Sequence, residues 1–170
     1  MIYIDCGAYD GDTILPFVKT YTPQKIFAFE ANPYLINKLQ QNVKHLPVEI
    51  IQKAVWIENG KQEFAIDKHQ NPFGSTLIKE KTNTWHNENP KVIVETIDFS
   101  SFLKQFIGQE VYVKIDIEGA EFAVMEKLIR DRTDAIITKL NIEFHHSKIG
   151  EDVMRANKIM DRFKGRTYEL

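Results

Sequence analysis

The sequence has a single cysteine, Cys6, and it contains no apolar run near the roughly 18 residues that a membrane-spanning helix needs. One thiol cannot form an internal disulfide, and no cysteine or histidine spacing is typical of structural zinc. The N-terminus lacks the charged and then apolar layout of a secretory signal. These absences predict a cytoplasmic protein in which Cys6 is a small core residue.

Neither sign of charge is in excess, because 22 lysines and arginines face 24 aspartates and glutamates, for a net charge of -2. Binding to nucleic acid or to an anionic membrane through the overall field would need a basic surplus. We therefore expect no membrane partner, and the charge disfavours a nucleic-acid partner, whereas a homodimer is compatible with this composition. Repeats, low-complexity tracts and linkers are also missing, so residues 1–170 are expected to form one domain.

Short apolar runs alternate with longer segments of helical periodicity. This alternation predicts an α/β fold, a Rossmann-like three-layer sandwich with a mostly parallel central sheet. The expected strands are 2–6, 25–30, 48–57, 62–66, 91–97, 111–117, 135–144 and an edge strand at 166–170, with an Asn59-Gly60 hairpin turn before 62–66. The expected helices are 13–21, 32–46 with Asn32 as N-cap, 98–106 capped by Asp98, 119–129 and 151–163.

The segment "IDCGAYDGDT" puts Asp5, Gly7 and Gly11 between the first strand and the first helix. A tight glycine turn followed by a helix N-terminus exposes backbone N–H groups and binds anions. Tyr9 occupies the place of the middle glycine of a dinucleotide fingerprint, which disfavours a nicotinamide-dependent oxidoreductase. The loop instead has room for a smaller anion, such as the carboxylate of an amino acid.

Glu30 ends the second predicted strand, at the spacing at which an acidic side chain binds the two hydroxyls of a ribose. A ligand with a ribose at one end and an amino acid at the other is S-adenosylmethionine. Asp5 is expected either to contact the ammonium of its methionine portion or to orient the glycine turn.

Six further segments occur in an order that covers nearly the whole chain. They are "FAFEANPYLINKLQQN", "KAVWIENGKQEF", "GSTL", "VETIDFSSFL", "VKIDIEGAEFAVMEKLI" and "IEFH". Together with the opening loop, they make the chain resemble the FkbM family of S-adenosylmethionine-dependent methyltransferases, and "KIDIEGAE" with the opening Asp-x-Gly is the specific part.

The resemblance implies a class I methyltransferase fold and a bound S-adenosylmethionine. The expected cofactor-binding residues are Asp5, Gly7, Ala8, Tyr9, Gly11, Thr13, Glu30, Ala31, Asn32, Ala54, Val55 and Asp116. The family usually has Glu-Pro-Asn-Pro where this chain has "EANP", so Ala31 gives a less rigid turn. Many members also have a helix before the first strand and a closing hairpin, so we expect either a pared-down enzyme or a piece of a longer product.

Methyl transfer to a hydroxyl requires alignment and removal or polarisation of the hydroxyl proton. The expected base is His145, whose ordinary pKa suits proton abstraction, with Asp116 or Glu143 as its orienting partner. In a second scheme, Asp116, Glu118 and Glu143 hold Mg²⁺, which acidifies a sugar diol. The sequence leaves both schemes open.

Several of these residues also have simpler interpretations. Glu118 and Glu121 suit the first turn of a helix as acids. His145 and His146 suit a strand end, and Lys114 is expected to bond a neighbouring loop. The polar segment 68–90 is either a surface excursion or a lid, in which "FGSTL" from Phe73 crosses the active-site mouth and Trp85 stacks on the acceptor.

The sequence therefore predicts an O-methyltransferase that uses S-adenosylmethionine and acts on a hydroxyl of a sugar or secondary metabolite, as a small molecule or glycan. The alternatives are a non-catalytic module that binds S-adenosylmethionine, an RNA ribose methyltransferase, and the disfavoured oxidoreductase. The acceptor class rests on the family resemblance alone.

Overall fold

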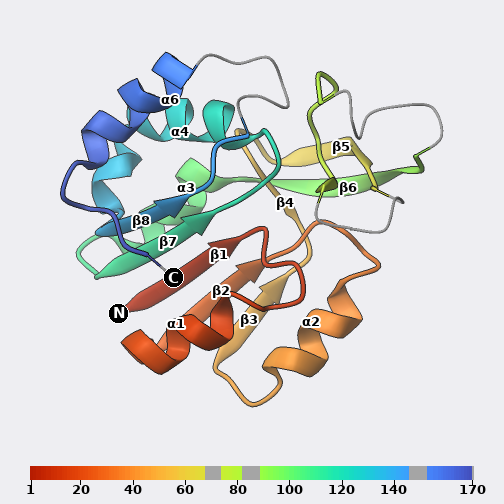
Figure 1. The fold of residues 1–170 in the computed structure, drawn as a ribbon, viewed down its shortest axis with the longest axis horizontal. Coiled ribbons are helices and arrows are strands. Elements are labelled where there is room, and N and C mark those ends of the chain that lie inside the picture. The colour runs from red at the N-terminus through yellow and green to blue at the C-terminus, as the bar shows by residue number, and fades with distance from the viewer. Residues whose placement is uncertain (68–73, 82–88, 146–152, 170) are drawn as a thin grey trace.

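The computed structural model describes residues 1–67, 74–81, 89–145 and 153–169, and they form a three-layer α/β fold (Figure 1). The central layer is a parallel sheet in the order β3-β2-β1-β7-β8. Its strands are β1 (Ile2–Cys6), β2 (Lys25–Phe29), β3 (Val48–Ile51), β7 (Val111–Ile115) and β8 (Lys139–Ile142). The predicted fold class is confirmed.

The strand order reverses at β1, which lies between β2 and β7. The chain first runs outward through β2 and β3 and then returns to form β7 on the other side of β1. Two crossovers that leave in opposite directions open a crevice at the carboxyl ends of these strands, and open α/β sheets bind ligands in such crevices. The residues that end β1, β2 and β7 are therefore the ones that surround the site.

The helices α1 (Ile14–Tyr21) and α2 (Ile36–Val43) cover one face of the sheet, and they lie below it in Figure 1. Their apolar residues pack on Tyr3 and its neighbours in β1 and β2. The rings of Tyr3 and Phe17 stack with centroids 3.7 Å apart. This packing fixes where α1 starts relative to the loop after β1.

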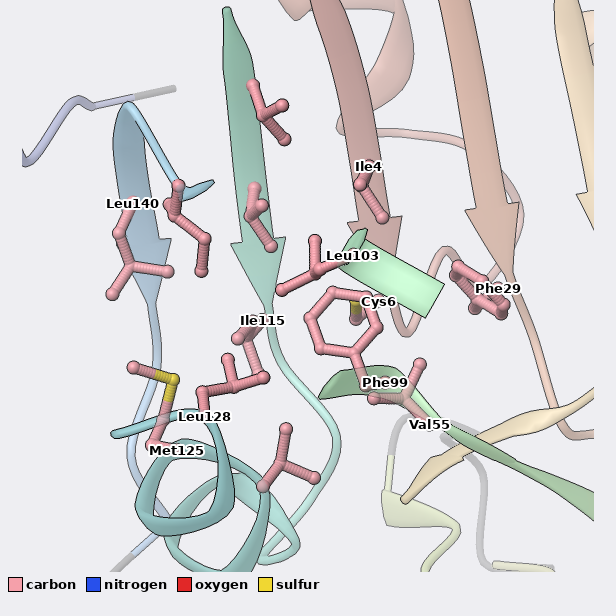
Figure 2. Close-up of a cluster of buried hydrophobic side chains, with 14 of the residues drawn as sticks. Ile4, Cys6, Phe29, Val55, Phe99, Leu103, Ile115, Met125, Leu128 and Leu140 are labelled. Atoms are coloured by element: carbon pink, nitrogen blue, oxygen red, sulfur yellow. The ribbon is translucent and has the colours of Figure 1, made fainter. Parts of the chain in front are cut away.

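The other face carries α3 (Phe99–Leu103), α4 (Glu121–Arg130) and α6 (Val153–Met160), with short 3₁₀ turns at Lys104–Phe106, Thr133–Ile136 and Asp161–Phe163. Figure 2 shows the core beneath them, where Cys6 is surrounded by Ile4, Phe99 and Leu103. Burial raises the pKa of the Cys6 thiol well above its ordinary value, in keeping with a core residue. Asp98 caps α3 as predicted, since its Oδ1 accepts from the Ser101 N–H at 3.1 Å.

A second sheet has the order β4-β6-β5, with β4 (Ala54–Trp56), β5 (Gly60–Ala65) and β6 (Lys91–Asp98). The predicted continuous strand 48–57 and the hairpin after it are therefore wrong. The chain turns at Lys53, whose N–H donates to the Ile51 carbonyl at 2.8 Å, and β4 leaves the main sheet. β6 then lies between β4 and β5, because Asn59 Oδ1 accepts from the Asp98 N–H and Glu58 O accepts from Thr96 Oγ1.

Three other predicted boundaries change. α2 starts at Ile36, after a turn at 33–35, and the Asn32 side chain accepts from the Tyr34 N–H of that turn and not from an N–H of α2. The first residues of the predicted strand 135–144 belong to the 3₁₀ turn before β8. Within the described part of the C-terminus, Thr167 makes only an isolated bridge to Leu140 in place of the predicted edge strand. Among the described helices, none has the length and apolar character to span a bilayer.

Candidate active site

A pocket with a volume of about 310 Å³ opens at the carboxyl ends of β1, β2 and β7, beside β4. Its lining includes, of the residues expected from the sequence, Gly7, Tyr9, Glu30, Ala31, Ala54, Val55, Asp116, Glu118, Glu143 and His145. Ser75 and Leu77, from the lid hypothesis, also line the pocket. The remaining lining residues were not singled out from the sequence, and they are Phe29, Leu35, Lys53, Phe64, Ile117 and Ala120. The pocket thus brings together residues that lie far apart in the sequence.

Two positions in the loop after β1 need glycine because neighbouring atoms leave no room for a Cβ. Gly7 has φ +83°, and a Cβ built there would lie 1.9 Å from the carbonyl oxygen of Asp116. Gly11 has φ +86°, and its Cβ would lie 2.8 Å from the Val43 side chain of α2. Both glycines are required by contacts within the protein, and Gly7 in addition lines the pocket.

Asp5 is fully buried behind this loop. Its Oδ2 accepts from Thr13 Oγ1 at 2.6 Å and from the Tyr3 hydroxyl at 3.3 Å. Thr13 precedes α1, so this bond ties the helix start to the end of β1. The geometry favours an orienting role for Asp5 over direct contact with a ligand. Ala8, also fully buried, packs with α1 and α2.

Lys114 holds the same loop from β7. Its Nζ donates to the Gly7 carbonyl at 3.2 Å and lies 3.5 Å from Asp5 Oδ1 and 3.4 Å from Asp116 Oδ2. Burial lowers the pKa of Lys114, but the two carboxylates outweigh it and the net direction is upward. Lys114 is therefore a charged internal strut that bonds a neighbouring loop, as the sequence predicted.

Glu30 points from the end of β2 to the N–H groups of two turns. One carboxylate oxygen accepts from Tyr9 N at 2.8 Å and the other from Asn32 N at 2.6 Å. Burial raises the pKa of Glu30 to about 7, although the two N–H bonds oppose the rise. Each oxygen keeps a second lone pair, so the carboxylate can accept further hydrogen bonds from a ligand in the pocket.

The rest of the lining is largely apolar. It includes Ala31, Leu35, Val55, Leu77 and Ile117, with Phe64 from the second sheet. Asn32, in contrast, is buried beside the pocket and acts through its N–H bond to Glu30. A flat, largely apolar group such as a purine ring suits this part of the lining.

The opposite end of the pocket carries three carboxylates and one imidazole. Nε2 of His145 lies 3.4 Å from Glu118 Oε1, 3.6 Å from Glu143 Oε1 and 3.8 Å from Asp116 Oδ1. His145 is only 4% exposed, whereas the Glu143 side chain is 68% exposed. The four side chains predicted to be catalytic are thus within reach of one substrate atom.

The close partner of His145 is Glu121, which the sequence suggested only as a first-turn acid. Nδ1 of His145 lies 2.9 Å from Glu121 Oε1, and the Glu121 carboxylate also accepts from the N–H groups of Ile117 and Gly119. Because an ionised carboxylate only accepts hydrogen bonds, the imidazole proton lies on Nδ1, and Nε2 faces the pocket. Asp116 and Glu143, the expected partners, lie on the Nε2 side.

Residues 74–81 form one wall of the pocket and are anchored on Glu118. The fully buried Lys81 donates to the Gly74 carbonyl at 2.7 Å and pairs with the Glu118 carboxylate, and Thr76 Oγ1 donates to the Glu118 carbonyl at 2.7 Å. Ser75 and Leu77 line the pocket, in keeping with the position expected of the lid. The other residues of that hypothesis, Phe73 and Trp85, lie outside the described residues, as does His146.

Sequence reasoning missed Lys81 altogether, because a lysine in a polar segment without periodicity carries no sign of burial. Two non-glycine residues of the pocket have left-handed backbones, Tyr9 at φ +50° and Glu118 at φ +56°. Such conformations cost about 1 to 3 kcal/mol and concentrate at functional sites. Both residues hold a polar group at an end of the pocket.

The parallel sheet, its switch point and the pocket there define a Rossmann-like α/β domain of the methyltransferase type. The chain belongs to the methyltransferase FkbM domain family, whose sequence model matches residues 5–170. The expected family is confirmed.

Among solved structures, the fold is similar to that of a methyltransferase FkbM from Methylobacillus flagellatus KT, with a TM-score of 0.58 and 15% sequence identity. The match covers 94% of this chain and 36% of that protein, so this chain spans about a third of its length. A comparison with curated protein sequences gives no match.

Proposed function

We propose that the protein transfers the methyl group of S-adenosylmethionine to a hydroxyl of a small molecule or glycan. The observation that carries this proposal is one pocket with two different polar ends. Glu30 lies at one end with unused acceptor capacity, and Asp116, Glu143 and His145 lie at the other. Family membership supports methyl transfer, and the acceptor class is part of the proposal.

The residues of the first end fit the nucleoside. Glu30 would accept from both ribose hydroxyls, and the apolar walls at Ala31, Leu35 and Val55 would hold the adenine ring. The amino-acid end would lie on the Gly7–Tyr9 turn, which Asp5 and Lys114 hold in place from behind. When bound, the cofactor supplies a methyl group on a sulfonium sulfur that takes the electron pair of the broken carbon–sulfur bond.

The residues of the second end fit a hydroxyl acceptor. The acceptor oxygen forms the new bond to carbon and loses its proton, so a group that polarises or takes this proton is needed. His145 presents Nε2 to this position, while Glu121 keeps Nδ1 protonated and fixes the ring. His145 can act there as a base, or as a ligand of a cation that acidifies the hydroxyl.

The negative charge at this end of the pocket limits which class of acceptor can bind. Asp116, Glu118 and Glu143 face this end of the pocket, and a phosphate or sulfate near them would be repelled. An RNA ribose acceptor brings a phosphate on each side of the target hydroxyl, so the site favours an uncharged acceptor. A purely binding module, the other alternative, would have no use for a histidine oriented by a buried glutamate.

The test is turnover by wild type and by one variant. Formation of S-adenosylhomocysteine should be measured over a panel of uncharged sugars and polyols, in wild type and in Asp116→Asn. The proposal predicts product with at least one acceptor and its loss in the variant, with the fold intact. Binding of the nucleoside without product over the whole panel would favour the binding module.

A further inference from the structure

The cluster of Asp116, Glu143 and His145 has the make-up of a metal-ligand set. Each residue offers one ligand atom, and these three atoms lie within 4.8 Å of one another. We propose that they hold one divalent transition-metal ion, of which Mn²⁺ is representative, at the acceptor end of the pocket. The inference rests on the proposed function for the role of the ion, whereas ion binding itself can be tested without cofactor or acceptor.

The spacing suits a common ligand. Two donor atoms that each lie about 2.1 Å from one ion, at angles between right-angled and tetrahedral, are separated by about 3.0 to 3.4 Å. Nε2 of His145 lies 3.6 Å from Glu143 Oε1 and 3.8 Å from Asp116 Oδ1. These two separations are slightly too long for direct hydrogen bonds, and an ion would need to shorten them by a few tenths of an ångström. The Asp116 and Glu143 ligand oxygens lie within 4.8 Å of each other.

Glu121 orients the imidazole of His145 for coordination. Metal-binding histidines usually donate their other N–H to a carboxylate, which fixes the tautomer and raises the basicity of the ligand nitrogen. Glu121 fills this position at 2.9 Å from Nδ1, and it is fully buried and held by two backbone N–H groups. The lone pair of Nε2 then points at carboxylate oxygens, an arrangement that a cation between them stabilises.

The nearby lysines engage other oxygens. Lys81 pairs with Oε2 of Glu118, and Lys114 approaches Asp116 at Oδ2, opposite the Oδ1 that faces His145. The ligand set differs from the one expected from the sequence, because His145 joins Asp116 and Glu143. Glu118 pairs with the fully buried Lys81 through Oε2, and its Oε1 lies 3.4 Å from Nε2 of His145. Asp116 is tied to Lys114 but still presents one oxygen to the cluster.

The presence of one imidazole among the ligands favours a transition-metal ion over Mg²⁺. Mg²⁺ prefers oxygen ligands alone, whereas Mn²⁺ and its first-row neighbours accept imidazole together with carboxylates. Three protein ligands leave coordination positions for solvent or for an acceptor hydroxyl. What such an ion would supply is acidification of a hydroxyl beside it.

The experiment is a titration of the purified chain with Mn²⁺, followed by the electron paramagnetic resonance signal of the free ion. We expect loss of signal that saturates at one ion per chain, and a Kd raised at least about tenfold in Glu143→Gln and in Asp116→Asn. Glu143 is exposed, so its substitution leaves the fold intact. Glu49→Gln, an exposed acid on β3 at the far edge of the sheet, is the matched control and should bind as wild type does.

Absence of saturable binding at millimolar Mn²⁺ would overturn the proposal, as would equal affinities in wild type, Glu143→Gln and Asp116→Asn. S-adenosylmethionine binding is measured by calorimetry on the same samples. If the nucleoside binds and Mn²⁺ does not, the ion site is refuted and the proposed function stands with His145 as base. If Mn²⁺ binds and the nucleoside does not, the proposed function fails while the ion site remains.

Discussion

At the scale of a single residue, Glu30 combines a proposed role that needs an ionised carboxylate with a buried position that disfavours one. In the proposed function its carboxylate must stay ionised, so that it can accept hydrogen bonds from two backbone N–H groups and from a ribose, yet burial raises its pKa to about 7. A neutral carboxyl would present a donor where the ribose hydroxyls also donate. Burial of an ionised Glu30 costs the folded protein stability, and a bound cofactor would offset this cost.

Glu30→Ala is expected to weaken S-adenosylmethionine binding by about 1 to 3 kcal/mol, the scale of lost hydrogen bonds to a charged group. Calorimetric titration measures this directly. Circular dichroism must show an intact fold, because the Tyr9 and Asn32 N–H groups lose their acceptor. Glu49→Ala is the control, and equal Kd values for wild type and Glu30→Ala would remove the ribose assignment.

The pH dependence of stability follows from the same shift. The pKa of Glu30 is about 7 in the folded protein and near its ordinary 4.5 in the unfolded chain, so between these values the folded state binds more protons. Stability must then fall as pH rises through this window, by about 3 kcal/mol in total for this one group.

Urea unfolding at about pH 5 and about pH 8 isolates this contribution when wild type is compared with Glu30→Gln, which cannot titrate. We expect the free energy of unfolding of wild type to drop relative to the variant as pH rises. A constant difference between the two proteins at both pH values would show that Glu30 titrates normally.

At the scale of elements, the loop after β1 depends on a close approach to β7. Gly7→Ala places a methyl group 1.9 Å from the Asp116 carbonyl and asks alanine to adopt φ +83°. We expect a loss of about 4 kcal/mol or more in unfolding free energy, because backbone atoms on both sides would have to move.

Gly108→Ala separates these two causes. Gly108 has a similar φ of +82°, and a Cβ there meets nothing within 4 Å. Its substitution should cost about 1 to 2 kcal/mol, the penalty of the left-handed conformation alone. If both variants unfold at the same urea concentration, the contact between the first loop and β7 is not what requires a glycine.

The wall formed by residues 74–81 depends on one buried ion pair. Lys81→Met removes the cation from beside Glu118 and leaves the Gly74 carbonyl without this donor. Breaking a buried pair costs about 3 to 5 kcal/mol. The exposed Lys79, 3.7 Å from Glu63, provides the control, and Lys79→Met should change stability by less than about 0.5 kcal/mol in the same urea experiment. A Lys81→Met protein as stable as Lys79→Met would contradict the anchoring role.

Periodicity and apolar runs were enough to predict the five strands of the main sheet and the helices on its faces. Burial on both sides makes β1 and β7 read as continuous apolar runs. The Asn59-Gly60 turn misled the prediction because its residues bond to β6, which is distant in sequence. A local signal cannot report such a partner.

The residues of the site also differ in whether a local sequence signal predicts them. Glu30 and His145 stand at strand ends, so their place in the pocket followed from the strand order alone. Lys81 and the role of Glu121 toward His145 depend on how a loop and a helix start pack against β7 and β8, and the sequence holds no periodic signal for them.

At the scale of the whole molecule, the matched family domain covers residues 5–170, and both ends of the pocket come from within it. We therefore expect this chain to bind the nucleoside on its own, through Glu30 and the first loop. A ligand specific for the folded state also stabilises it, by about 2.7 kcal/mol at a concentration of 100 times Kd.

The most direct measurement is calorimetric titration of the purified chain with S-adenosylmethionine and with S-adenosylhomocysteine. We expect saturable binding of one nucleoside per chain for both, with affinity reduced in Glu30→Ala and unchanged in Glu49→Ala. A flat titration with both nucleosides, on protein that circular dichroism shows to be folded, would contradict it.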